Sequence, residues 1–313
     1  MHPILNFTDL TAHLQQLGRR FRLSIVCGSD DSTAGAAMRA VNMALPKPFS
    51  LAIAMLCAVS LCAEYQGNHV SFVEADTHES AAQQAVMLVR EGKADVLMKG
   101  LLHTETLLRA VLNKEWGILP KGRVLTHIAV AQIPAYHKLL FFTDAAVIPY
   151  PTHEQRVAQV AYLADMLHAF GIQRPRISLI HCAETVNDKF RTRWATAKFA
   201  NVRLRANGAN SCRWSARPPH LVRPRRPSAQ GIQSPLEGDA DAVVVPDIEV
   251  GNVLYKSLPL FAGAQMAGTL QGTLAPVVLP SRGDDLEAKF IRWHWLPWLL
   301  TRPKGPSNGC EEC

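Results

Sequence analysis

Short apolar runs alternate with longer stretches of helical periodicity along most of the chain. Several of the short runs are apolar on both faces, as strands are when helices cover both sides of a parallel sheet. The predicted strands are residues 23–27, 70–74, 95–98, 125–132, 139–143, 177–182, 242–245 and 276–279. The predicted helices are residues 79–91, 104–114, 154–170 and 253–267. This alternation predicts an α/β fold with a doubly wound sheet.

The size and the apolar content predict a folded protein with two lobes. The 313 residues, 48% of them hydrophobic, can fill one large core or two medium ones, which excludes disorder of the whole chain. The longest apolar run, 51–63, is interrupted by Ser60 and is shorter than the roughly 18 residues of a membrane-spanning helix. The first 20 residues lack the charged-then-apolar order of a signal peptide. We therefore expect a cytoplasmic protein with no membrane partner.

Charged or hydroxyl side chains follow four of the predicted strands. These residues are Lys99 with Gly100, then Asp144, then Asp247, and last Ser281 with Arg282. In open α/β sheets, ligands bind beyond the carboxyl ends of the strands, where helix N-termini also offer N–H groups to an anion. The sequence therefore predicts a cleft for an anionic small molecule, with Lys99, Arg109 and Arg282 as candidate cations.

Several enzyme classes lose support because their motifs do not occur. The sequence contains no G-x-x-x-x-G-K-[ST] loop, no G-x-G-x-x-G after a strand, no G-x-S-x-G elbow and no H-E-x-x-H. Cys310 and Cys313 form a lone C-x-x-C, which supplies only two of the four ligands of a structural zinc. We expect no metal site.

Several segments, in order and at similar spacing, resemble motifs of the phosphate acetyl/butyryltransferase family. The segments are 94–112 (ADVLMKGLLHTETLLRAVL), 142–147 (FTDAAV), 183–187 (AETVN), 238–241 (GDAD), 246–252 (PDIEVGN) and 280–284 (PSRGD). The resemblance implies reversible acyl exchange, in which acyl-CoA and phosphate give acyl phosphate and CoA, with acetyl or butyryl as the acyl group. It implies CoA as a substrate, no tightly bound cofactor, and a homodimer.

The same resemblance implies a fold and a set of site residues. The fold would be a two-lobed, three-layer αβα fold like that of isocitrate and isopropylmalate dehydrogenases. One lobe would comprise residues 1–149 and 273–313, and the other residues 150–272, with the active cleft between them. Arg282 and Arg109 would bind phosphate, Ser281 would hydrogen-bond the reacting thioester or its oxyanion, and Asp285 or Asp284 would be the general base. The other substrate- or phosphate-binding candidates are Lys99, Gly100, His103, Thr104, Asp144, Asp247, Gly251 and Asn252.

Each of these assignments also has a purely structural interpretation, which is weakest for Ser281 and Arg282 because such a pair directly after a buried strand is hard to place in a core. Lys99 and Gly100 would form a strand-to-helix turn with a solvated lysine, and Arg109 would be an ordinary surface residue. Thr104 is predicted to be a helix N-cap, with His103 in a capping or packing role. Asp144, Asp247 and Asn252 would only hold loops and helix starts in place through hydrogen bonds.

The segment 191–230 departs from the rest of the chain in composition. It holds ten of the 33 basic residues and four prolines but no acidic residue, so the remainder carries 23 basic and 26 acidic groups. It shows no helical or strand periodicity, and we predict no regular element in it. The family pattern would place a helix, a strand and a glycine–proline–leucine turn here, in a segment of about this length. We interpret 191–230 as the product of a reading-frame slip and its restoration, and 290–313 and 49–63 as further cases. Such a chain would fold poorly or work feebly, because apolar faces of neighbouring elements would stay uncovered.

Other interpretations of this segment and of the chain remain open. The basic segment could be an arm that binds RNA or DNA, or a solvated insert. The whole chain could be an enzyme of the same fold with other chemistry, such as acyl-phosphate synthesis for lipids or metal-dependent dehydrogenation. It could also be a non-enzymatic basic RNA-binding protein. We favour the acyltransferase, and expect no nucleic-acid partner.

The frame-slip hypothesis predicts what the gene encodes in its other frames. We expect codons 191–230 to encode the missing family-like residues in one of the two alternative frames, and a repaired protein to be more active than the present chain. Sequencing the gene and comparing the two purified proteins check both points. Two alternative frames without family-like residues, or equal activities, would contradict the hypothesis.

Overall fold

The computed structural model describes residues 3–16, 22–28, 33, 35, 50–55, 70–180, 213–215 and 238–280. The chain divides into two compact units, which are considered separately. Unit 1 comprises Met1–Asn6, Thr126–Met266 and Arg302–Cys313, and unit 2 comprises Phe7–Leu125 and Ala267–Thr301. The lobe boundaries expected from the sequence, after residues 149 and 272, stay a prediction.

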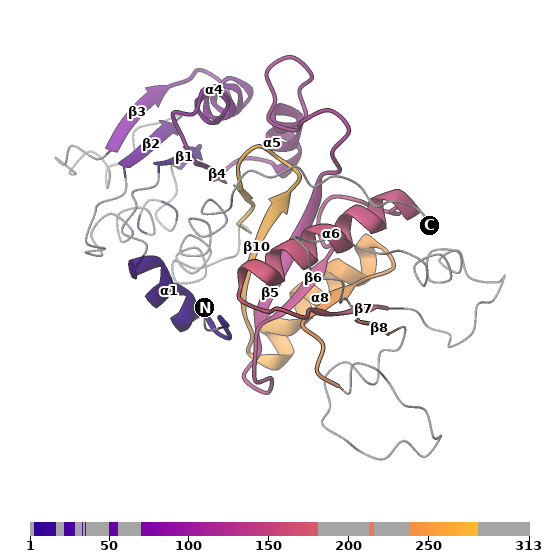
Figure 1. The fold of residues 1–313 in the computed structure, drawn as a ribbon. Helices are drawn as coiled ribbons and strands as arrows, with labels where there is room; N and C mark the ends of the chain where they lie inside the picture. The colour runs from indigo at the N-terminus through magenta and orange to yellow at the C-terminus, as the bar shows by residue number, and fades with distance from the viewer. Residues whose placement is uncertain are drawn as a thin grey trace, which may run out of the picture. The chain divides into compact units, whose positions relative to one another are not determined.

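Unit 2 contains a sheet with the strand order β3-β2-β1-β4-β11-β10 (Figure 1). All neighbouring strands in it run parallel except β10 and β11, which are antiparallel. The strands are β1 (Arg22–Val26), β2 (Ser50–Met55), β3 (Val70–Glu74), β4 (Val96–Lys99), β11 (Val277–Val278) and most of β10 (Gln265–Gln271). The helices are α1 (Phe7–Gln16), α4 (His78–Arg90) and α5 (Thr104–Val111). Helix α4 packs on β1, β2 and β4 and buries alanines and valines there.

Unit 1 contains the strand order β5-β6-β9-β7-β8, with β5 and β6 antiparallel and the remaining neighbours parallel. The strands are β5 (Thr126–Gln132), β6 (Leu140–Thr143), β7 (Arg176–Leu179), β8 (Arg213–Ser215) and β9 (Ala242–Val244). The helices are α6 (His153–Ala169) and α8 (Ile248–Ala262). Both units thus combine a mainly parallel sheet with helices, which confirms the predicted α/β class.

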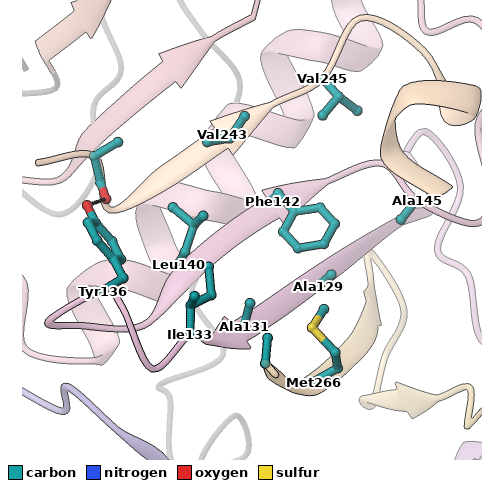
Figure 2. Close-up of a cluster of buried hydrophobic side chains, with 12 residues drawn as sticks. Ala129, Ala131, Ile133, Tyr136, Leu140, Phe142, Ala145, Val243, Val245 and Met266 are labelled. Atoms are coloured by element: carbon teal, nitrogen blue, oxygen red, sulfur yellow. Dashed lines mark hydrogen bonds between the residues drawn. The ribbon is translucent and has the colours of Figure 1, made fainter. Parts of the chain in front are cut away.

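The two helices that the structure describes in unit 1 cover opposite faces of its sheet. Successive side chains of a strand point to opposite faces, and in β6 Phe141 contacts Phe170 beyond the end of α6, whereas Phe142 contacts Tyr255 of α8. On the α8 side a cluster of buried residues joins β5, β6 and β9 (Figure 2). Tyr136 packs at its edge and donates a hydrogen bond of 2.6 Å to the Ala240 carbonyl. Burial raises the pKa of the Tyr136 phenol well above its ordinary value, with nearby carboxylates adding to the effect.

Most predicted elements are present, with end shifts of one to three residues, but helix α8 was predicted wrongly. The prediction started it at residue 253 and ended it at residue 267. The structure starts it at Ile248, because Asp247 is the N-cap and accepts a hydrogen bond from the Val250 N–H. The helix ends before Gly263, which takes a left-handed conformation with φ of 59° that glycine adopts at little cost. The residues beyond it form the unpredicted strand β10.

Two strands lie in segments for which no strand was predicted. Strand β8 falls within 191–230, where no strand periodicity was recognised, and pairs parallel with β7. Strand β2 falls within 49–63 and pairs with β1 and β3. Both segments therefore contribute to the sheets, and the prediction of no regular element in 191–230 was wrong for residues 213–215. The rest of 191–230 and all of 290–313 lie outside the described residues.

A cluster of charged side chains in unit 1 joins the amino ends of β6, β7 and β9 through ion pairs and hydrogen bonds. The Lys138 ammonium pairs with both Asp239 and Asp241, and Asp241 also accepts a hydrogen bond of 2.7 Å from the backbone N–H of Arg176. The Lys138 and Asp241 side chains are only 9% and 5% exposed. Removing one member of a buried pair leaves the other charge without compensation, which is costly.

Lys138→Met should therefore lower the free energy of unfolding by about 3 kcal/mol. The matched control is Lys93→Met, because Lys93 pairs with Glu91 on the surface with 66% of its side chain exposed. Exposed pairs contribute less than about 1 kcal/mol. Urea unfolding followed by circular dichroism measures both values. Equal losses in the two variants would show that the buried cluster does not stabilise unit 1.

Candidate active site

The candidate residues described in unit 2 lie at the carboxyl end of β4 and on α5. Lys99 is the last residue of β4 and only 4% exposed, and its ammonium donates hydrogen bonds of 3.2 Å to the carbonyls of Gly100 and Leu102. The Lys99 ammonium is therefore held against the turn that follows its strand, and the structural alternative of a solvated lysine is wrong because the side chain is buried. It remains a candidate for phosphate binding because the turn itself belongs to the resembling motif.

Gly100 lies where the ends of β1 and β4 meet. A Cβ at this position would lie 2.3 Å from the Cys27 carbonyl oxygen and 2.6 Å from that of Val26. The N–H groups of Gly100 and Leu101 donate to those same two carbonyls at 2.7 Å. Only glycine fits such an approach, so this residue determines how the turn leaves the strand.

Helix α5 begins one residue earlier than a Thr104 N-cap would require. His103 occupies the N-cap position and makes no side-chain capping hydrogen bond, and Thr104 is the first helical residue. The prediction that Thr104 caps the helix is therefore wrong, which leaves the Thr104 hydroxyl outside the capping role. Both residues stay binding candidates.

Arg109 extends from α5 into solvent, with 79% of its side chain exposed. Its guanidinium pairs at 2.6 Å with Glu105, one helical turn earlier. An exposed pair of this kind is weak, so an incoming phosphate could displace the carboxylate. The structure thus presents an accessible cation.

In unit 1, Asp144 is the centre of the described hydrogen-bond network at the end of β6. The residue is 2% exposed. Its Oδ1 accepts from the N–H groups of Ala146 and Val147, and its Oδ2 accepts from the N–H groups of His127 and Ile148. The Thr126 hydroxyl donates a further hydrogen bond of 2.7 Å to Oδ2. With five donors on its two oxygens, this carboxylate holds the loop after β6 onto the start of β5.

The start of helix α8 is docked on the same loop. A Cβ on Gly251 would lie 2.0 Å from the Asp144 carbonyl oxygen, and the Asn252 amide donates a hydrogen bond of 3.2 Å to the Ala145 carbonyl. The Ile248 N–H donates to the Pro149 carbonyl at 3.0 Å. The segments that carry Asp144, Asp247, Gly251 and Asn252 are thereby brought together. The contacts of Asp144, Asp247 and Asn252 are those of the structural interpretation, which ties loops and a helix start, and their role in substrate binding stays a prediction.

Two features near this group were not recognised in the sequence. The Arg156 guanidinium, on the first turn of α6, donates to the carbonyls of Val245 and Pro246 just beyond β9. Burial lowers the pKa of this guanidinium, although the Asp247 charge acts in the opposite direction. The Tyr150 hydroxyl donates to Glu249 at 2.8 Å and lowers the pKa of that carboxyl group. No sequence signal distinguishes an inward-facing arginine from the exposed arginines of other helices.

The remaining predicted site residues, Ser281, Arg282 and Asp285 with its alternative Asp284, lie outside the described residues. Within the described ranges, no group of three His, Cys, Asp or Glu residues is arranged to hold a metal ion. The helices in these ranges also include none that is both long and apolar enough to cross a bilayer.

The geometry defines a class of α/β protein with polar residues gathered beyond the carboxyl ends of its strands, and comparison with known proteins gives the family. Residues 54–291 match the family described as Phosphate acetyl/butaryl transferase. The chain belongs to this family, as the motifs predicted.

Individual relatives agree with this assignment. The chain is 37% identical over 213 residues to the phosphate butyryltransferase of Clostridium beijerinckii, a match that covers 67% of this chain and 70% of the relative. It is 30% identical over 263 residues to the phosphate acetyltransferase of Rhizobium meliloti, covering 83% of each. The crystal structure of a branched-chain phosphotransacylase from Enterococcus faecalis superposes with a TM-score of 0.76 at 30% identity, covering 90% of this chain and all of that one.

The contact between Gly251 and Asp144 generates a prediction. Gly251→Ala should push the start of α8 away from the loop after β6, because the added methyl would meet a backbone carbonyl at 2.0 Å. We expect a loss of about 2 kcal/mol or more in stability, within the range for overpacked sites. Thermal and urea unfolding measure the loss.

Ser257→Ala, on the same helix, is the matched control. Alanine is the better helix former, and Ser257 is only partly buried, so stability should hold or rise slightly. A Gly251→Ala protein as stable as this control would contradict the close approach.

Proposed function

We propose that this chain transfers an acyl group reversibly between CoA and phosphate, with acetyl or butyryl as the acyl group. The observation that carries the proposal is the family match over residues 54–291. The grouping of Asp144, Asp247, Gly251 and Asn252 at the ends of β6 and β9 supports it. CoA is a substrate in this proposal, and no tightly bound cofactor is involved.

In the direction of acyl-CoA formation, the CoA thiol first loses its proton to the carboxylate of Asp285 or Asp284. The thiolate sulfur then attacks the acyl phosphate carbonyl carbon, and the bond from that carbon to the phosphate oxygen breaks. Ser281 hydrogen-bonds the oxyanion, and Arg282 and Arg109 hold the phosphoryl oxygens, because guanidinium groups match them with bidentate hydrogen bonds. Phosphate leaves and the thioester remains.

The proton transfer sets a requirement on the base. An aspartate with a pKa near 4 and a thiol near 8.5 differ by about 4.5 units, which corresponds to about 6 kcal/mol against the transfer. Burial or a neighbouring carboxylate would have to raise the aspartate pKa, and cations near the sulfur would have to lower the thiol pKa. A base in this site must therefore be partly desolvated.

The finer structural expectations belong to the same proposal. The lobes 1–149 with 273–313 and 150–272 would form an isocitrate dehydrogenase-like fold, assembled as a homodimer in the cytoplasm. Lys99, Gly100, His103 and Thr104 would be binding residues of unit 2, and Asp144, Asp247, Gly251 and Asn252 would be binding residues of unit 1. The segment 191–230 would be a frame-slipped replacement that lowers activity without changing its type.

Thiol release from acetyl-CoA and butyryl-CoA tests the proposed reaction. With a coloured thiol reagent as readout, release should require added phosphate, which separates acyl transfer from simple thioester hydrolysis. The ratio of kcat/KM for the two thioesters gives the chain-length preference. No phosphate-dependent release from either thioester at high protein concentration would contradict the proposal.

Arg282→Gln should lower kcat/KM with phosphate at least about tenfold, because it removes a charge-assisted hydrogen bond to the transferred phosphate. Arg90→Gln is the matched control, since Arg90 is exposed at the end of α4 and donates to the Gly117 carbonyl at 3.2 Å. It should stay within about twofold of the original protein, a difference of less than about 0.5 kcal/mol. Equal losses in the two variants would exclude Arg282 from phosphate binding.

A further inference from the structure

We propose that Arg156 is a positioning residue for the acyl-transfer reaction, which fixes the segment that leads from β9 into α8. The inference rests on the proposed function, because Asp247, Gly251 and Asn252 are its candidate binding residues. Arg156 itself lies on α6, in none of the motifs that indicate the family.

The first argument is that the Arg156 guanidinium is buried and depends on two backbone carbonyls. The residue is 7% exposed, and its guanidinium donates to two backbone carbonyls, at 3.2 Å to Val245 and also to Pro246. Burying a cation is unfavourable unless its donors are satisfied, and burial lowers the pKa of this guanidinium. The carbonyls of Val245 and Pro246 offset the cost of burying the cation only while the segment keeps its present backbone conformation. The charge and the segment conformation therefore depend on each other.

The second argument is that the segment is held from two sides. On one side the end of β6 accepts a hydrogen bond of 2.9 Å from the Val245 N–H to the Thr143 carbonyl, and the loop after β6 accepts one of 3.0 Å from the Ile248 N–H to the Pro149 carbonyl. On the other side Arg156 binds its carbonyls. Asp247 lies between these attachments and caps α8. Without Arg156, the N–H groups of Val245 and Ile248 would keep their hydrogen bonds, and the carbonyls of Val245 and Pro246 would each lose the one from the guanidinium.

The third argument concerns what a small displacement does to a binding group. Reacting groups must be held close to one geometry, and a shift of about 1 Å can lower a rate by about 100-fold. Asp247 follows Pro246 directly, and Asn252 lies on the second turn of the helix that Asp247 begins. A segment that moves would carry both with it. Arg156 thus acts on substrate binding without touching substrate.

The variants that test this are Arg156→Met and Arg156→Lys, with Arg176→Met as the matched control. Arg176 belongs to the same unit and pairs with Asp239 at the amino end of β7, with 37% of its side chain exposed. Asp239 keeps Lys138 and His137 as partners when Arg176 is removed. The control therefore removes a guanidinium of unit 1 at the amino ends of the strands, whereas Asp247 lies beyond their carboxyl ends.

Two readouts separate positioning from stability. Hydrogen–deuterium exchange of the peptide covering 244–252 should be about tenfold faster in Arg156→Met than in Arg176→Met, a ratio that corresponds to about 1.4 kcal/mol of local opening. In the thiol-release assay, Arg156→Met should raise the KM for acyl-CoA or phosphate about tenfold with a smaller change in kcat. Arg156→Lys should fall between Arg156→Met and the original protein, and Arg176→Met should leave KM unchanged.

The outcomes distinguish this inference from the proposed function. Unchanged exchange at 244–252 in Arg156→Met overturns the inference whatever the activity. Faster exchange with KM unchanged also overturns it, because the segment would then move without consequence for binding. An original protein without phosphate-dependent thiol release overturns the proposed reaction and the role of Arg156 in it, even if the exchange result shows that Arg156 holds the segment.

Discussion

The buried carboxylate of Asp144 is the interaction on which the described part of unit 1 depends. Its two oxygens accept five hydrogen bonds, four from backbone N–H groups and one from the Thr126 hydroxyl. Hydrogen bonds to a charged group are stronger than neutral ones, and a buried charge without them is costly. The loop after β6 therefore has one conformation, and its carbonyls become a fixed surface for helix α8. The close approach of Gly251 is possible only because that surface does not move.

Much of the fold could be predicted from local patterns. Strand β3 has the predicted bounds, and α4, which Thr77 caps, begins one residue before its predicted start. These features depend on residues close in the sequence, such as a hydroxyl three positions before the N–H that it accepts from. Helix α8 was predicted less well because its apolar positions continue into β10, and apolar periodicity alone does not separate a buried helix from a buried strand.

The site could be predicted only in part, for a different physical reason. The strand pattern placed Asp144 and Asp247 correctly beyond the ends of β6 and β9, and their binding role stays a prediction. The partners of Asp144 could not be inferred, because Thr126 and Gly251 are distant in sequence and come together only through the sheet. Arg156 was missed because helical periodicity indicates which face is apolar and does not show that an arginine on it reaches two carbonyls of another loop.

The ion-pair cluster of Lys138, Asp239 and Asp241 has a consequence for how this protein can change. The cluster joins the amino ends of strands whose carboxyl ends carry Asp144 and Asp247, and a strand of three or four residues separates the two ends by only about 10–13 Å. A buried ion-pair cluster and candidate binding residues therefore lie at opposite ends of the same short strands. Substitutions in the ion-pair cluster can therefore change stability while the loops that carry Asp144 and Asp247 keep their conformation.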